Sequence, residues 1–215
     1  GLRITDLSVT TYIHSLDRGN APFLEDMRSY AEDAGVPVIR REMESFIRVL
    51  IELVQPVKIL EIGAGCGYSS LFMAEYTDTD CAITTIENHK ERIEDAKRFI
   101  AASENGCKVT LLDGNAAVFL PELEGEYDFI FLDAAKGQYI TFLPHILRLL
   151  RKGGALLADN VLQEGALVMS RYATPRRQRT IHDRMREFVW EVTHSPLLET
   201  SLIPIGDGVT LSIKK

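Results

Sequence analysis

The chain has 215 residues, of which 46% are hydrophobic and 26% are charged, a balance typical of a soluble globular protein with one sizeable core. It has no apolar run long enough to span a membrane and no basic-then-apolar signal segment, so we expect no membrane association. The formal net charge of −7 argues against indiscriminate nucleic-acid binding, although a local basic patch is compatible with it.

The three cysteines, Cys66, Cys81 and Cys107, are odd in number and lack the spacing of a metal site. They indicate free thiols in a reducing compartment, and we therefore expect a cytoplasmic protein. The chain begins with Gly1 and not with methionine, so we interpret this glycine as the remnant of an expression tag.

The first 55 residues predict a layer of three helices, over residues 4–18, 22–34 and about 40–55. This layer has three interpretations: a lid over a cofactor, a dimer surface, or plain core packing. A loose apolar stripe runs along the first segment, formed by Ile4, Leu7, Tyr12, Ile13 and Leu16.

The stretch from Val57 to Ser69 predicts a buried strand, a tight loop and the start of a helix. An ordinary turn needs one glycine, whereas this loop has Gly63, Gly65 and Gly67, which allow a ligand to approach the backbone closely. The pattern favours a nucleotide-type cofactor. A carboxylate at the strand end, Glu61, is awkward beside a pyrophosphate but suits a cationic ligand such as S-adenosylmethionine, which carries a sulfonium and an ammonium group.

Strand and helix patterns alternate after this loop, without a linker or a repeat. Such alternation predicts a single domain, residues 1–215, with the helical layer (1–55) followed by a sheet core (56–215). The expected fold is α/β and doubly wound: a mostly parallel seven-stranded sheet that ends in an antiparallel hairpin around Gly206-Asp207-Gly208. The predicted strands after the first are 82–86, 109–112, 127–132, 154–158, 197–204 and 209–213, and the helices are 88–104, 137–150 and 175–194.

Polar residues follow the predicted strands at the edge where open α/β sheets bind ligands. Glu87 comes about 20 residues after the glycines, the position of an acid that bonds ribose hydroxyls. Asp113, with Gly114 and Asn115, falls where an adenine would lie. Each acid has an alternative role as the cap of the next helix.

Asp133 ends the fourth predicted strand, and Asp159 and Asn160 end the fifth. These strands should be neighbours, which brings two carboxylates and an amide oxygen together, a donor set that suits Mg²⁺ or a similar hard cation. Lys136 lies beside the same edge, where it could take a proton from a substrate hydroxyl; the alternative is a solvated lysine at a helix start.

Four motifs resemble the metal-dependent O-methyltransferases of the catechol and caffeoyl-CoA type, over nearly the whole chain. They are Glu61-Ile-Gly-Ala-Gly-Cys-Gly-Tyr-Ser69, Phe131-Leu-Asp-Ala-Ala-Lys136, Asp159-Asn160 and Pro204-Ile-Gly-Asp-Gly208. The resemblance implies a Rossmann-like class I methyltransferase fold, Lys136 as catalytic base beside Asp133, and Mg²⁺ (or Mn²⁺ or Ca²⁺) on Asp133, Asp159 and Asn160. It implies S-adenosylmethionine contacts by Glu61, Gly63, Gly67, Tyr68, Ser69, Glu87, Asn88, Asp113, Gly114, Asn115, Ala116 and Asp133.

Within that group the chain is most similar to the bacterial tRNA 5-hydroxyuridine methyltransferases, through Tyr30-Ala-Glu-Asp-Ala-Gly-Val-Pro37, Ala134-Ala-Lys-Gly-Gln-Tyr139, Asp159-Asn-Val-Leu162 and Pro175-Arg-Arg-Gln-Arg179. This similarity implies methylation of the wobble nucleotide to 5-methoxyuridine, tRNA as partner and a homodimer.

An arginine-rich segment supports the RNA interpretation independently. Residues 171–186 contain six arginines and one acid, Asp183, and the helical pattern separates most of these cations from an apolar face. A solvated helix face or an inter-subunit salt-bridge surface are the alternatives. Trp190 falls on the exposed side, where it could stack on a base or on a partner subunit. The candidate RNA-binding residues are Arg171, Arg176, Arg177, Arg179 and Arg184.

Two other functions fit parts of the pattern. A catechol and a 5-hydroxyuracil both offer two adjacent oxygens, so a small-molecule catechol or hydroxycinnamoyl O-methyltransferase is the first alternative. A nicotinamide-binding oxidoreductase, or a catalytically silent cofactor-binding subunit, is a more remote one.

Overall fold

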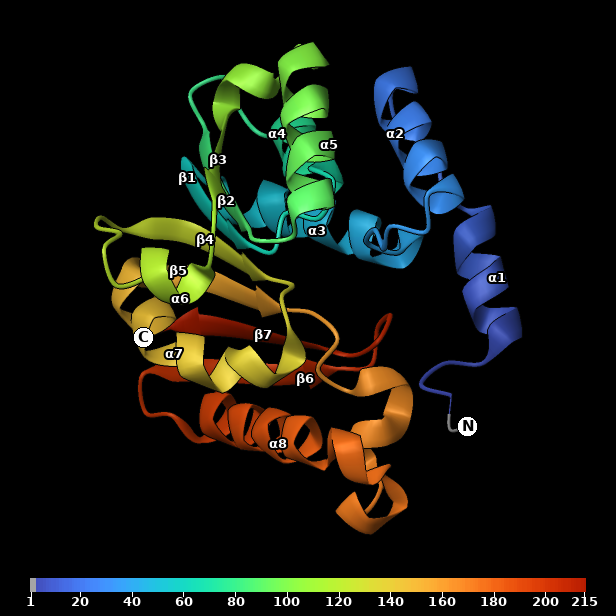
Figure 1. Cartoon of the computed structure of the whole chain (residues 1–215), viewed down its shortest axis with the longest axis vertical. Helices are drawn as coiled ribbons and strands as arrows, with labels where there is room; N and C mark the ends of the chain where they lie inside the picture. Colours follow the sequence, from blue (N-terminus) through green and yellow to red (C-terminus); the bar gives the residue numbers. More distant parts are fainter. Residues whose placement is uncertain (1–2) are drawn as a thin grey trace.

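The computed structural model describes residues 3–215, so the interpretation of Gly1 lies outside the described residues. A seven-stranded sheet with strand order β3-β2-β1-β4-β5-β7-β6 forms the centre of the molecule (Figure 1). The first five strands in this order pair in parallel, and β7 pairs antiparallel with both β5 and β6, which confirms the predicted fold class. The strands are β1 (Lys58–Ile62), β2 (Ala82–Glu87), β3 (Val109–Asp113), β4 (Tyr127–Leu132), β5 (Leu150–Ala158), β6 (Leu198–Ile203) and β7 (Val209–Lys214).

The helices agree with the sequence pattern apart from their ends. They are α1 (Leu7–Ser15), α2 (Pro22–Asp33), α3 (Arg41–Val54), α4 (Tyr68–Tyr76), α5 (Lys90–Ala102), α6 (Ala116–Phe119), α7 (Tyr139–Leu149) and α8 (Arg179–His194). Short 3-10 turns are η1 (Gly106–Lys108), η2 (Lys136–Gln138), η3 (Gln163–Val168), η4 (Arg171–Ala173) and η5 (Arg176–Gln178).

Two element starts were predicted wrongly by four residues, and one short helix was not predicted. The helix expected from residue 175 begins at Arg179, because a 3-10 turn follows Pro175. The strand expected from residue 154 begins at Leu150, whose side chain is buried and which pairs with Tyr127 ahead of two glycines that hide the strand pattern. The short helix α6 was not predicted, since four residues are too few for a periodic signal.

Each strand of the sheet faces two hydrophobic cores. In β1, Ile59 packs with α2, α3 and α4, whereas Leu60 and Ile62 pack with α7 and α8 on the other face. Figure 1 shows the resulting three layers, with α3, α4 and α5 on one side of the sheet and α7 and α8 on the other. Because both faces are covered at the centre of the sheet, β4 and the second half of β5 are near-continuous apolar runs, whereas β6 and β7 at the edge alternate with polar residues.

The N-terminal layer is not uniform. Helices α2 and α3 bury apolar residues such as Met27 and Ile47, so core packing explains them. Helix α1 buries no residue, and its His14 contacts Glu42 of α3 at 2.5 Å. The core-packing interpretation is therefore wrong for α1, and its apolar stripe as a dimer surface stays a prediction.

The remaining compositional expectations concern membranes and thiols. Within residues 3–215, the helices are too short or too polar to cross a membrane. Cys66 and Cys81 are buried, Cys107 is exposed, and all three are free thiols, as predicted.

Candidate active site

The glycine loop between β1 and α4 adopts a backbone that other residues rarely take. Gly63, Gly65 and Gly67 have φ of 101°, 55° and 91°, in the left-handed region that favours glycine. A Cβ at Gly63 would lie 1.9 Å from the backbone oxygen of Asp133, so the loop and the end of β4 touch main chain to main chain. Gly67 caps α4 and lies against Ala96 of α5. The three glycines thus fix a close approach of the loop to its neighbours.

A cavity of about 600 Å³ opens above this loop at the carboxyl ends of the parallel strands. Of the predicted cofactor residues, those in its wall are Gly63, Tyr68, Ser69, Glu87, Asn88, Gly114, Asn115, Ala116 and Asp133. Lys136 and Asn160 also line it. The cavity therefore brings the glycine loop and the candidate catalytic residues into one space.

Three predicted cofactor residues do not line the cavity: Glu61, Gly67 and Asp113. Asp113 is exposed and pairs with Lys97 of α5 at 3.4 Å. Glu61 is fully buried behind the loop, where its carboxylate accepts hydrogen bonds from the hydroxyls of Ser69 and of Thr85, the latter at 2.7 Å. Burial raises the pKa of Glu61 to about 7. Its two hydrogen bonds connect β1 to the start of α4 and to β2 behind the loop.

Glu87 has two possible roles in the sequence, as the cap of the next helix or as a ligand of ribose. Its Oε1 accepts from the backbone N–H of Gly65 at 2.8 Å, and its Oε2 accepts from Asn88 and His89, the two residues before α5. The N-cap of α5 is His89, so Glu87 orders the approach to the helix and does not cap it. Oε1 has a second lone pair, and the residue lines the cavity, so a contact with a ribose hydroxyl stays a prediction.

The opposite end of the cavity is formed by Gly114, Asn115 and Ala116. The Asn115 side chain accepts from the N–H of Ala117 at 2.9 Å and so caps α6. Its amide nitrogen remains available as a donor. At Gly114 a Cβ would lie 2.9 Å from the ring of Phe119, so close packing favours glycine there. This end suits a flat, hydrogen-bonding ring such as adenine.

The N-terminal layer contributes one segment to the cavity. Residues Pro37–Ile39, between α2 and α3, line it, and a role of this layer as a lid stays a prediction. Tyr68, the first residue of α4, is buried and donates its hydroxyl to Glu44 of α3, which also pairs with Arg28 of α2 at 3.0 Å. The buried carboxylate thus connects this layer to the start of the glycine-loop helix.

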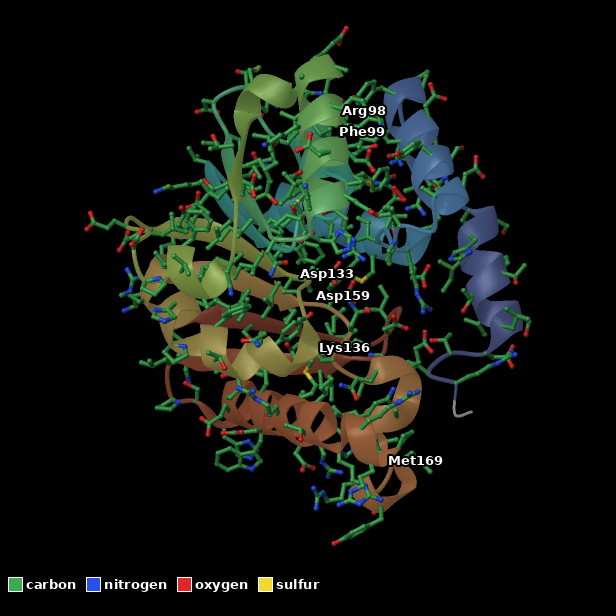
Figure 2. The ribbon with its side chains drawn as sticks, viewed as in Figure 1. Arg98, Phe99, Asp133, Lys136, Asp159 and Met169 are labelled. Atoms are coloured by element: carbon green, nitrogen blue, oxygen red, sulfur yellow. The ribbon has the colours of Figure 1, made fainter. Side chains whose placement is uncertain are left out.

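Asp133, Asp159 and Asn160 lie together, as the strand order requires. Leu132 at the end of β4 is in register with Ala158 at the end of β5, and each strand is followed directly by its acid. Asn160 donates from Nδ2 to Asp133 Oδ1 at 2.8 Å and has φ of 61°, a conformation that asparagine tolerates. Figure 2 shows Asp133, Asp159 and Lys136 near one another at this edge of the sheet.

Burial raises the pKa of both Asp133 and Asp159 above the ordinary value, because few groups offset their charges. Two nearby carboxylates in a buried site favour a compensating cation. Within residues 3–215 no cluster of three or more His, Cys, Asp or Glu side chains could hold a metal ion. The set here is instead two carboxylates and an amide, whose hard oxygens fit a magnesium-type cation completed by water or substrate. Their role as metal ligands stays a prediction.

Sequence reasoning missed two residues beside this cluster, Asp207 and Arg40. Both line a smaller cavity of about 230 Å³ together with Asp133, Asp159 and Asn160. Arg40 pairs with Asp207 at 2.5 Å and lies 3.7 Å from Glu164. The signal for Asp207 was present in the motif Pro204–Gly208, but the sequence pattern indicated only a hairpin turn there. Nothing in the sequence indicated a role for Arg40 at this site, because it lies in the N-terminal layer and not at the end of a strand.

Lys136 is half-buried at the start of η2 and lines the large cavity. Within residues 3–215 its ammonium group makes no hydrogen bond and no ion pair. The turn that carries it is anchored by Tyr139, which is buried and donates its hydroxyl to the backbone oxygen of Asp159 at 2.8 Å. The lysine is thus held at the site with its nitrogen available to a substrate.

The candidate RNA-binding arginines divide into two groups. Arg171 pairs with Asp183 at 2.9 Å, Arg179 donates to the backbone oxygen of Thr174, and Arg184 donates to Thr141 of α7. Arg176 and Arg177 are exposed and have no side-chain partner within residues 3–215. A purely solvated face therefore describes Arg176 and Arg177 but not the other three arginines, which have partners within the protein. RNA binding by this segment stays a prediction.

The family of the chain follows from comparison with known proteins. Residues 14–215 match the family model described as O-methyltransferase. The chain belongs to this O-methyltransferase family, which confirms the predicted enzyme class, an S-adenosylmethionine-dependent methyltransferase, and argues against the nicotinamide-binding alternative.

Individual relatives agree with this assignment. The tapetum-specific methyltransferase 1 of Arabidopsis thaliana is 30% identical over 183 residues, covering 83% of this chain and 77% of the relative. Caffeoyl-CoA O-methyltransferase 5 of Nicotiana tabacum is 31% identical, covering 77% of this chain and 72% of the relative. Among solved structures, the S-adenosylhomocysteine-bound methyltransferase PaMTH1 of Podospora anserina has a TM-score of 0.86 at 28% identity, with 97% and 94% of the two chains covered.

Proposed function

We propose that this protein transfers the methyl group of S-adenosylmethionine to one oxygen of an adjacent oxygen pair, with the help of a divalent cation such as Mg²⁺. One observation carries the proposal: Asp133 and Asn160 line both the cavity above the glycine loop and the smaller cavity beside it, and Asp159 joins them in the smaller one. The relatives named as caffeoyl-CoA O-methyltransferases support the reaction class.

The cavity offers a place for each part of the methyl donor. Gly63 and Ser69 would contact the methionine end, Glu87 would accept from the ribose hydroxyls, and Asn115 with Ala116 would hold the adenine. The cavity volume of about 600 Å³ is in the range of ligand pockets, so donor and reacting oxygen fit within one space.

The chain's own residues would bind the cation and remove the proton of the acceptor hydroxyl. Asp133, Asp159 and Asn160 would hold the cation, which when bound favours ionisation of the acceptor hydroxyl and fixes its orientation. The Lys136 nitrogen would accept the hydroxyl proton as the oxygen forms its bond to the methyl carbon. The carbon–sulfur bond breaks with its electron pair on sulfur, and S-adenosylhomocysteine leaves.

Two acceptor classes fit this site. A small phenol with adjacent hydroxyls is supported by the relatives. The 5-hydroxyuridine of a tRNA wobble position offers the same oxygen pair and is favoured by a different observation, the unpartnered Arg176 and Arg177. The phenol agrees better with the proteins that the chain is similar to, and the tRNA nucleotide agrees better with the surface charge of the chain.

The proposal is tested with purified protein, S-adenosylmethionine labelled in the methyl group and Mg²⁺. Catechol, a hydroxycinnamoyl thioester and tRNA lacking the wobble modification are offered separately. We expect transfer to at least one of them and loss of transfer in EDTA, restored by Mg²⁺. Full activity in EDTA would contradict the metal role.

A further inference from the structure

One cation in the wall of the large cavity has no partner in the protein. Arg92, the third residue of α5, is half-buried and lines the cavity. Within residues 3–215 its guanidinium group makes no hydrogen bond and no ion pair. The guanidinium carries several N–H donors in a planar fork and no acceptor, so the side chain is available to an anionic ligand.

The packing of α5 places Arg92 beside the glycine loop. Ala96, one turn later on the same helix, lies against this loop, because a Cβ on Gly67 would be 3.4 Å from its Cα. Residues four apart share a helix face, and their side chains point back toward the helix start. Arg92 therefore lies on the face of α5 that meets the loop, one turn nearer to the carboxyl ends of the strands. Burial raises the pKa of Asp133, and the charges of Lys136 and Arg92 oppose this shift, which agrees with a position facing the same cavity.

The glycine loop has little left to offer an anion. Four of its backbone N–H groups are already donated within the protein, those of Gly63, Ala64, Gly65 and Gly67. The hydroxyl of Ser69 is donated to the buried Glu61, so its oxygen can only accept from a ligand. Ser69 therefore suits the ammonium group of S-adenosylmethionine and not its carboxylate.

The charges along the wall divide in the same way. The acids that line the cavity are Glu87 and Asp133, and the permanent cation and the lysine are Arg92 and Lys136. S-adenosylmethionine carries a sulfonium, an ammonium and a carboxylate group. The acids suit its positive groups, whereas its carboxylate is best bound by a cation. Under the proposed function Lys136 is needed at the reacting oxygen, which leaves Arg92 for the carboxylate.

We propose that Arg92 binds the carboxylate of the methionine part of S-adenosylmethionine and thereby orients the amino-acid end of the cofactor. A planar guanidinium binds a carboxylate through two parallel N–H···O bonds, which fix orientation as well as affinity. The inference rests on the cofactor site of the proposed function and adds to it a residue inside a helix, away from the strand ends and the glycine motif.

The test measures binding without metal or acceptor. Isothermal titration calorimetry of the full-length protein in EDTA gives the Kd of three ligands. They are S-adenosylhomocysteine, its decarboxylated analogue, in which hydrogen replaces the carboxylate, and methylthioadenosine, which lacks the whole amino-acid part. The variants are Arg92→Met and Arg92→Lys. Lys90→Met is the matched control, because Lys90 is exposed in the first turn of the same helix and does not line the cavity.

Arg92→Met should weaken binding of S-adenosylhomocysteine about 10- to 100-fold, the usual contribution of hydrogen bonds between charged groups. It should not weaken binding of the decarboxylated analogue or of methylthioadenosine, since neither has a carboxylate. Arg92→Lys should bind S-adenosylhomocysteine with intermediate affinity, because lysine keeps the charge but loses the planar fork. Lys90→Met should bind all three ligands like the wild type.

Equal affinity of Arg92→Met and the wild type for S-adenosylhomocysteine would overturn the inference. An equal loss for S-adenosylhomocysteine and the decarboxylated analogue would also overturn it, because Arg92 would then act on the nucleoside part or on the fold. The expected binding pattern without methyl transfer to any acceptor would leave the inference standing and defeat the proposed function. Methyl transfer by the wild type with an unchanged Kd in Arg92→Met would do the reverse.

Discussion

The proposed site has a cofactor end, the large cavity above the glycine loop, and an acceptor end, the smaller cavity beside it, and the two are built in different ways. The cofactor end is formed by backbone and by residues that directly follow β1, β2, β3 and β4, so the sheet itself places them. The acceptor end combines strand-end acids with Arg40 from the N-terminal layer and Asp207 from the hairpin turn. Under the proposed function, methyl-donor binding would be fixed by the sheet, whereas acceptor choice would depend on loops that can vary independently.

The largest effect should come from the cofactor end, by Gly63→Ala. Its Cβ would overlap the backbone oxygen of Asp133, and main chain cannot move aside easily. We expect the free energy of unfolding to fall by more than about 3 kcal/mol in urea titrations, and binding of S-adenosylhomocysteine to be lost.

Gly35→Ala is the control for Gly63→Ala. Gly35 also has positive φ, at 68°, but nothing lies within 4 Å of a Cβ added there. The Gly35→Ala variant should lower the free energy of unfolding by only about 1–2 kcal/mol, the conformational cost of a positive φ without a steric clash. Equal losses in the two variants would show that close packing of the loop is not what requires glycine.

At the acceptor end, Asp159→Asn should separate chemistry from donor binding. We expect kcat to fall at least about 100-fold because a charged cation ligand is lost, while the Kd of S-adenosylhomocysteine changes little. Calorimetry and a methyl-transfer assay give the two values. Asp113→Asn, an exposed acid outside the cavity, is the control and should keep full activity; an unchanged kcat in Asp159→Asn would remove the metal role from this end.

Lys136→Met should lower kcat about 10²- to 10⁴-fold, the usual contribution of a positioned general base, with donor affinity retained. The measurement is single-turnover methyl transfer over a range of pH. Lys152→Met serves as control. A lysine that is only solvated would give the same rate in both variants.

The smallest effect concerns the support behind the glycine loop. Burial raises the pKa of Glu61 from 4.5 to about 7, so the folded protein holds this proton more tightly than the unfolded chain does. The free energy of unfolding should therefore decrease as pH rises from 4.5 to about 7, by at most about 3 kcal/mol from this group.

The variant Glu61→Gln tests this pH dependence, because glutamine does not titrate. The variant and the wild type should have similar Tm at pH 5, and the variant should be the more stable of the two at pH 8. Identical pH dependence in thermal melts of the two proteins would show that Glu61 does not titrate in this range.

The sheet, and most of the residues that line the large cavity, could be predicted from the sequence for a physical reason. Apolar strands, glycines and strand-end acids such as Glu87 and Asp133 are local in the chain, and parallel pairing then brings them to one edge. The Arg40–Asp207 pair could not be predicted, because its partners are 167 residues apart and neither belongs to a periodic pattern. Asp113 does not line the cavity, because strand position alone does not indicate whether a terminal side chain faces the cavity or solvent; its contact with the cofactor stays a prediction.

The central claim is that Asp133, Asp159 and Asn160 hold a divalent cation at the boundary between these two ends. Mn²⁺ binding followed by electron paramagnetic resonance, without acceptor, tests it most directly. We expect stoichiometric binding by the wild type, displacement by Mg²⁺, and loss of binding in Asp133→Asn/Asp159→Asn while S-adenosylhomocysteine still binds. Mn²⁺ binding of equal strength by the wild type and the double variant would contradict the claim.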